Sequence, residues 1–156
     1  MESDESVATS MRAYLGRRYR MSASHRLECA ALTAEENRAV YGKCNNPHGH
    51  GHNYVVEVVV GGEVDPVTGM ICDLGALDLC VTKEIVDRFD FANLNCDPAF
   101  KNLVPTTENL NIVIYNALKA AFTQANLVEV RVEETTNNSF AYPIGSPAVD
   151  AAHKGT

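Results

Sequence analysis

Apolar and polar positions along the chain follow patterns that predict four strands and three helices. The strand-like segments are 13–24, 53–64, 128–133 and 139–143. In 128–133 every second residue is valine, as expected for a strand with one buried face. Apolar residues recur at helical spacing over 74–89, and a second long helix is predicted over 106–125. A shorter helix over 33–41 opens with Thr33-Ala34-Glu35-Glu36, the pattern of a capping box.

These elements predict an α+β fold. The four strands are expected to form one antiparallel sheet, with the two longer helices on one of its faces. A single small sheet leaves its edge strands unpaired, and stable proteins cover or pair such edges. We therefore expect the chain to form homo-oligomers through the edges of its sheet.

The chain has 156 residues, which fits one domain, and 46% of them are hydrophobic, enough for a core of ordinary size. Residues 1–10 and 145–156 are rich in small and polar side chains. Such composition cannot bury enough apolar surface to order a segment. We expect a disordered N-terminus over 1–10, a single domain over 11–144 and a flexible tail over 145–156.

Net charge and cysteine content indicate which binding partners and which cellular compartment to expect. The formal net charge of −7 argues against nucleic acid and anionic membrane as partners, because both need a basic surface. The sequence also has no apolar run long enough to span a bilayer, and its acidic start lacks the features of a signal peptide. No CxxC pair occurs among Cys29, Cys44, Cys72, Cys80 and Cys96. We expect reduced thiols and a cytoplasmic protein.

Cysteine and histidine gather in one short segment, Cys44-Asn45-Asn46-Pro47-His48-Gly49-His50-Gly51-His52. His50 and His52 lead into a strand, where residues i and i+2 point to the same face. Two imidazoles at this spacing can grip one metal ion, and neutral imidazole is a good zinc ligand. A catalytic zinc usually has three protein ligands and one open position, so a third ligand is expected elsewhere. The other histidines are His25, His48 and His153, and the last lies in the predicted tail.

Several motifs, in this order, resemble the 6-pyruvoyltetrahydropterin synthase family. They are Ser22-Ala23-Ser24-His25-Arg26-Leu27, Gly42-Lys43-Cys44-Asn45-Asn46-Pro47, Gly49-His50-Gly51-His52-Asn53-Tyr54, Asp65-Pro66-Val67-Thr68-Gly69-Met70, Thr106-Thr107-Glu108-Asn109, and Glu134-Thr135 before Asn137-Asn138. The resemblance implies a tunnelling fold, in which subunits form trimers with a continuous sheet barrel, trimers stack into a hexamer and active sites lie between subunits. It also implies a small-molecule substrate, 7,8-dihydroneopterin triphosphate, which loses triphosphate to give 6-pyruvoyltetrahydropterin in tetrahydrobiopterin-type biosynthesis.

The zinc ligands implied by this resemblance are His25, His50 and His52. The substrate hydroxyls would take the open position, where zinc polarises their oxygens and acidifies the adjacent C–H. Cys44 would be the general base, because a nearby cation stabilises its thiolate. Two alternatives stay open: a structural zinc with Cys44 as fourth ligand, and a metal site built on Cys44, His48 and His50, the Cys-x3-His-x-His spacing of 6-carboxytetrahydropterin synthase. The strand that follows favours His50 and His52 as ligands and leaves His48 in a surface loop.

The resemblance also assigns the pterin pocket. Glu134 would anchor the ring, since a carboxylate can accept two parallel hydrogen bonds from its amino and ring N–H groups. Thr106, Thr107 and Glu108 would complete the pocket at a helix start, although helix capping alone also accounts for Thr106 and Glu108. Cations near the site in sequence would suit the triphosphate, unless they form a solvated face: Arg17, Arg18, Arg20, Arg26 and Lys43.

One position departs from the family pattern. The family carries an Asp-His pair in which the histidine relays protons, whereas this chain has Asp90-Phe91. Losing a general acid or base typically costs about 10²–10⁴-fold in rate. Asp90 stays a candidate catalytic residue, but its partner is missing. The usual reaction could use another proton donor, the chain could carry out variant pterin side-chain chemistry, including that of 6-carboxytetrahydropterin synthase, or it could bind pterin with little or no turnover.

Overall fold

The computed structural model describes residues 11–144 of the chain. The predictions for 1–10 and 145–156, including His153, lie outside the described residues. The elements are β1 (Arg12–His25), α1 (Ala34–Tyr41), η1 (Gly42–Asn45), β2 (His50–Glu63), α2 (Leu74–Val81), η2 (Thr82–Val86), α3 (Asp87–Phe89), β3 (Ala92–Asn93), η3 (Leu94–Cys96), η4 (Pro98–Phe100), α4 (Thr107–Ala121), β4 (Asn126–Thr135) and β5 (Asn138–Tyr142).

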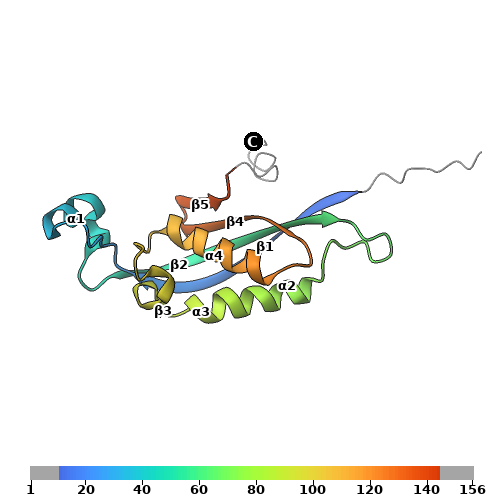
Figure 1. The fold of residues 1–156 in the computed structure, drawn as a ribbon, viewed down its shortest axis with the longest axis horizontal. Coiled ribbons are helices and arrows are strands. Elements are labelled where there is room, and N and C mark those ends of the chain that lie inside the picture. Colours follow the sequence, from blue (N-terminus) through green and yellow to red (C-terminus); the bar gives the residue numbers. More distant parts are fainter. Residues whose placement is uncertain (1–10, 145–156) are drawn as a thin grey trace, which may run out of the picture.

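The sheet has the order β3-β1-β2-β4-β5, and its four long strands are antiparallel (Figure 1). The predicted α+β fold is therefore confirmed, but the sheet has five strands and not the predicted four. A fifth strand, β3, adds two residues in parallel to the end of β1. Sequence patterning did not predict β3, because two residues carry no periodicity.

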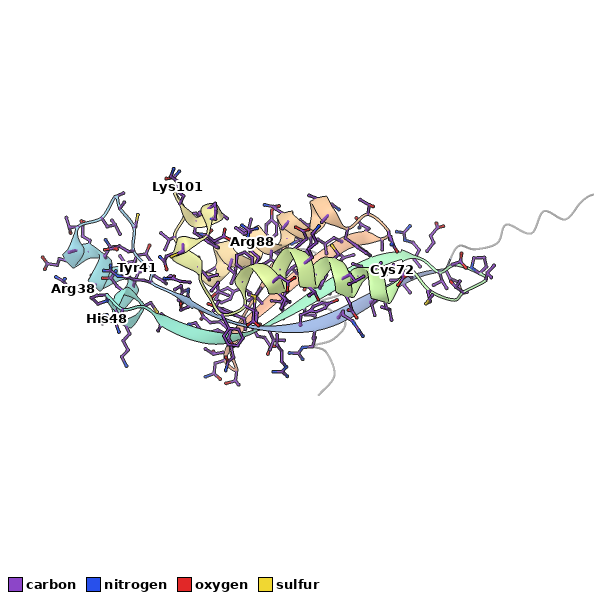
Figure 2. The ribbon with its side chains drawn as sticks, turned by 90° about the horizontal axis from the view of Figure 1, so that it is seen from below. Arg38, Tyr41, His48, Cys72, Arg88 and Lys101 are labelled. Carbon is purple, nitrogen blue, oxygen red and sulfur yellow. The ribbon has the colours of Figure 1, made fainter. Side chains whose placement is uncertain are left out.

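β1 and β2 are the two longest strands, and they pair without a break from Arg12↔Glu63 to His25↔His50. β2 begins at His50, three residues before the predicted strand. Helices α2 and α4 pack on one face of this sheet, as predicted for the two longer helices (Figures 1 and 2). The chain between His25 and His50 leaves the sheet to form α1 and η1 and then returns to it. These two histidines therefore lie side by side although they are 25 positions apart in the sequence.

The predicted helix over 74–89 is helical throughout but contains a π-helical turn. Residues Thr82–Val86 form this turn between α2 and α3. The apolar stripe stays intact across it, since Leu77, Val81, Ile85 and Phe89 are all fully buried. The second long helix ends at Ala121 instead of 125, because Phe122 has an extended backbone and leads toward β4.

Alternation along the strands assigns each side chain to a face. On β1, Met21, Ala23 and His25 are buried, and on the same face of β2 the buried side chains are Tyr54, Val56, Val58 and Val60. The residues between them, such as Arg18 and Ser22, point to the uncovered face. Arg18 pairs there with Glu133, so Glu133 faces away from the histidines. No helix within 11–144 has the length and apolar character needed to cross a membrane.

Candidate metal centre

The strand register brings three histidines together. His25 ends β1 and lies directly opposite His50, and His52 lies opposite Ala23 on the same face. One ligand nitrogen from each of the three imidazoles lies within 4.8 Å of the other two. The three histidines that the resemblance implies as metal ligands are therefore brought together by one pair of strands. The register of β1 against β2 places His25 beside the other two.

Glycines let the two strands approach at this point. Gly49 has φ +70°, in the left-handed region that favours glycine, and a Cβ built on it would lie 2.9 Å from the carbonyl oxygen of His25. A Cβ on Gly51 would lie 3.3 Å from the carbonyl oxygen of Ala23. The Gly-His-Gly-His sequence thus combines ligands on one face with close backbone contact.

The hydrogen bonds of the cluster suit a metal ion. His25 Nδ1 lies 2.8 Å from the carbonyl oxygen of Pro105, so the ring proton is assigned to Nδ1 and the lone pair to Nε2. That Nε2 lies 3.1 Å from His50 Nε2. The buried His52 Nε2 has no hydrogen-bond partner among residues 11–144. Burial lowers the pKa of both His25 and His52, which favours the neutral imidazole that binds metal.

Cys44 lies in η1 and is not part of the group of metal-ligating atoms. This placement speaks against a structural zinc with Cys44 as fourth ligand. The turn that carries Cys44 is hydrogen-bonded to the segment that follows His25: the amide of Leu27 donates to the Cys44 carbonyl oxygen at 2.9 Å. The side-chain amide of the buried Asn45 donates back to the Leu27 carbonyl oxygen at 2.7 Å. Burial and then the charge of Glu134 raise the pKa of the Tyr54 hydroxyl, and Cys44 lies near enough to this hydroxyl to act in the same direction.

His48 is exposed and lies with Arg38 and Tyr41 at the α1 end of the molecule (Figure 2). Its backbone amide donates to Asn46 Oδ1 at 3.1 Å, which shapes the loop. His48 does not belong to the three-histidine group, so the structure places it in the surface loop and not in the alternative ligand register.

Glu134 lies beside the histidines. Its Oε1 accepts a hydrogen bond from Thr107 Oγ1 at 2.6 Å and is 3.6 Å from His52 Nε2. Thr107 is buried at the start of α4, whereas Thr106 caps this helix by accepting from the amide of Asn109. Glu108 is exposed in the first turn. Glu134 and Thr107 thus join the metal centre, while Thr106 performs the expected capping.

Asp90 and Phe91 lie at the outer edge of β1, just before β3. Asp90 Oδ1 accepts from the amide of Ser22 at 2.7 Å, and the Phe91 amide donates to the Ser22 carbonyl oxygen. Phe91 is 90% exposed, has φ +54°, and borders a shallow depression that is also lined by Ser22, His52 and Asn53. Both contacts are to the main chain of Ser22, and Asp90 is not part of the three-histidine group.

The candidate phosphate-binding cations divide into two groups. Three already have a carboxylate partner: Arg17 with Asp78, Arg18 with Glu133, and Arg26 with Glu28. Arg20 and Lys43 make no ion pair within the described part of the chain. Lys43 precedes Cys44 in η1, and Arg20 lies on the uncovered face, two residues from Arg18.

Sequence reasoning missed three residues that shape this site. Pro105 orients His25 through its carbonyl oxygen, and Asn45 holds the Cys44 turn. Tyr54 lies two residues after His52 on the same face, and the two rings are 5.5 Å apart. The spacing of His50, His52 and Tyr54 was the available signal for Tyr54.

Comparison with known proteins agrees with this geometry. The profile of the family described as 6-pyruvoyl tetrahydropterin synthase matches residues 14–144. The chain is 43% identical over 141 residues to the human 6-pyruvoyl tetrahydrobiopterin synthase, covering 90% of this chain and 97% of the human one. The 6-pyruvoyl tetrahydrobiopterin synthase of Poecilia reticulata is 46% identical over 130 residues, covering 83% of this chain and 88% of the relative.

A solved structure agrees as well. The Caenorhabditis elegans 6-pyruvoyl tetrahydropterin synthase superposes with a TM-score of 0.83 at 39% identity, covering 87% of this chain and 98% of that one. The fold thus defines an enzyme with a tunnelling-type domain, and its three histidines could hold a metal ion. The chain belongs to the 6-pyruvoyl tetrahydropterin synthase family, and it is an enzyme of that family's lyase type.

Proposed function

We propose that this chain is a zinc-dependent carbon–oxygen lyase that converts 7,8-dihydroneopterin triphosphate to 6-pyruvoyltetrahydropterin and triphosphate. The observation that carries the proposal is the group of His25, His50 and His52 with the Glu134 carboxylate beside it. Three imidazoles leave an open position for substrate, as in catalytic zinc sites. The names of the relatives support the same reaction.

The chemistry divides between the ion and the side chains. When bound at these imidazoles, zinc supplies Lewis-acid polarisation of the substrate hydroxyl oxygens. Cys44 removes the proton from the side-chain carbon, and its turn is fixed for this task by Leu27 and Asn45. Glu134 accepts hydrogen bonds from the pterin amide edge, and Thr107 holds the carboxylate in place.

Phe91 is the feature that sets this chain apart. Phenylalanine cannot relay a proton, so we propose that another donor, such as water or a nearby hydroxyl, completes the usual reaction. Retention of the zinc ligands, Cys44 and Glu134 favours this proposal over altered pterin chemistry or binding without turnover. Asp90 keeps its tie to β1 through Ser22 and would act in catalysis from a neighbouring subunit.

We further propose that the protein is a cytoplasmic homohexamer, a dimer of trimers. Among residues 11–144, the outer edge of β1 pairs only with the two residues of β3, and β5 forms the other edge of the sheet. We propose that neighbouring copies pair with these two edges. The exposed Phe91 ring would be covered in such an assembly. All five cysteines are free thiols, which suits a reducing compartment.

The proposed function is tested by product analysis. Zinc-loaded protein is incubated with 7,8-dihydroneopterin triphosphate, and the products are identified by mass, with Glu134→Gln as the matched variant. We expect 6-pyruvoyltetrahydropterin and one triphosphate per turnover, and far less of both from the variant. Formation of 6-carboxytetrahydropterin would favour the alternative enzyme, and pterin binding without either product would favour a non-catalytic homologue.

The Phe91→His variant decides how the missing relay is replaced. If the site was built for the usual relay, histidine at this position should raise the elimination rate about 100-fold, the low end of the typical contribution of a general acid or base. An unchanged rate in the variant would mean that the proton is delivered by another group. Asp90→Asn in the same background is the control, because the aspartate should matter only when it has a histidine to orient.

A further inference from the structure

Tyr54 carries a buried hydroxyl group that the proposed mechanism does not use. The residue is 1% exposed, and its hydroxyl has no hydrogen-bond partner within 11–144. Buried polar side chains nearly always have a partner, so an exception calls for an explanation. Phenylalanine would fill the same space without leaving a polar atom unpaired.

The neighbours of this hydroxyl are the groups of the candidate pocket. Val55 pairs with Glu133 across β2 and β4, so the next pair along the ladder sets Tyr54 opposite Glu134 on the face of the histidines. A phenol carries its proton at neutral pH and can donate it. Thr107, whose hydroxyl donates to Glu134 Oε1 at 2.6 Å, is the third member of this group.

The Thr107 hydroxyl has one proton and gives it to Glu134, which leaves its oxygen free to accept. The Glu134 Oε1 atom accepts from Thr107 and lies 3.6 Å from His52 Nε2, without a hydrogen bond to it. A ligand that offers two N–H groups to this carboxylate requires it to hold one orientation, and a second donor behind the pair would fix that orientation.

We propose that Tyr54 is a positioning residue for Glu134, and that its hydroxyl donates to the Thr107–Glu134 pair when the carboxylate binds the amide edge of a ligand. The inference rests on the proposed function, since that function makes the ligand a pterin. Tyr54 acts through Glu134 and does not touch the reacting atoms.

A double-mutant cycle tests the proposal. The affinity for neopterin is measured by fluorescence titration in the zinc-loaded wild type, Tyr54→Phe, Glu134→Gln and the double variant. We expect Tyr54→Phe to weaken binding about three- to tenfold, and to have no further effect when Glu134 is already changed, since residues that act as a unit are not additive. Affinity for zinc alone should be the same in Tyr54→Phe and the wild type.

The control is Tyr19→Phe. The Tyr19 hydroxyl donates to Asp78 at 2.8 Å, so this variant loses a hydrogen bond outside the site and should melt at a lower temperature with unchanged neopterin affinity. Tyr54→Phe should melt at or above the wild-type temperature, because it removes an unpaired polar group. A lower melting temperature would show a structural hydrogen bond and overturn the proposal.

The remaining outcomes separate the inference from the function on which it rests. Wild-type affinity for neopterin in Tyr54→Phe, or additive effects of the two substitutions, would overturn the role of Tyr54 alone. A wild-type protein that binds no neopterin would overturn the proposed function and the positioning role together.

Discussion

The substitution Gly49→Ala should weaken zinc binding although it changes no ligand. Gly49 has φ +70°, and an added Cβ would lie 2.9 Å from the carbonyl oxygen of His25. Gly69→Ala is the matched control, because Gly69 has φ +71° and an added Cβ there meets nothing within 4 Å. Both variants place an L-residue in the left-handed region, which costs roughly 1–2 kcal/mol of folding stability.

Only Gly49→Ala also has a steric conflict. Its Cβ falls about 0.5 Å short of ordinary van der Waals contact, which begins at 3.4 Å. Relief requires β1 and β2 to move apart where His25 and His50 lie opposite each other. Metal sites tolerate deviations of about 0.2 Å in ligand distance, so we expect at least a tenfold loss of zinc affinity, or about 1.4 kcal/mol.

The assay is a competition titration of zinc against a chelator, with urea unfolding of the metal-free variants alongside. Gly69→Ala should lose stability but keep wild-type zinc affinity. Gly49→Ala should lose more stability and bind zinc more weakly. Equal stability losses and equal zinc affinities in the two variants would refute the reasoning that close strand contact builds the metal centre.

Three further outcomes are expected. Asn45→Ala should lower kcat more than zinc affinity and cost about 1–3 kcal/mol of stability, measured by turnover and urea unfolding, because the Leu27 carbonyl oxygen loses its buried donor. Thr107→Val should raise KM for the pterin substrate in steady-state assays and leave zinc affinity unchanged, because Glu134 loses its hydrogen bond. The stability of the metal-free protein should fall as pH drops below about 6.5. Burial lowers the pKa of His25 and His52 in the folded protein, so the unfolded chain binds more protons in this range. Urea midpoints that do not change between about pH 7.5 and 5.5 would contradict this.

The sequence predicted most of the fold because the patterns are long and periodic. The apolar stripe over 74–89 placed α2 and α3 correctly, although no pattern indicated the π-helical turn between them. The capping box at Thr33 and the cap at Thr106 were found from local rules and are formed as expected. β3 and the left-handed backbone of Phe91 depend on contacts with β1, which no local pattern encodes.

The site was less accessible to sequence reasoning. The spacing of His50 and His52 was sufficient to predict a chelating pair on one strand face. His25 was found only through the family resemblance, because its place beside His50 is a matter of register across a long connection. The groups that orient the site residues could not be predicted from the sequence. The Pro105 carbonyl oxygen and the Asn45 side chain each act through one tertiary hydrogen bond, which no local pattern encodes.

X-ray absorption spectroscopy of the zinc-loaded protein tests the central claim most directly. If His25, His50 and His52 hold the ion and leave a position for substrate, the first shell should contain three imidazole nitrogens at about 2.0–2.1 Å, an oxygen and no sulfur. A sulfur ligand at about 2.3 Å would show that Cys44 closes the site as a structural ligand, and the account of Cys44 as the catalytic base would then be wrong.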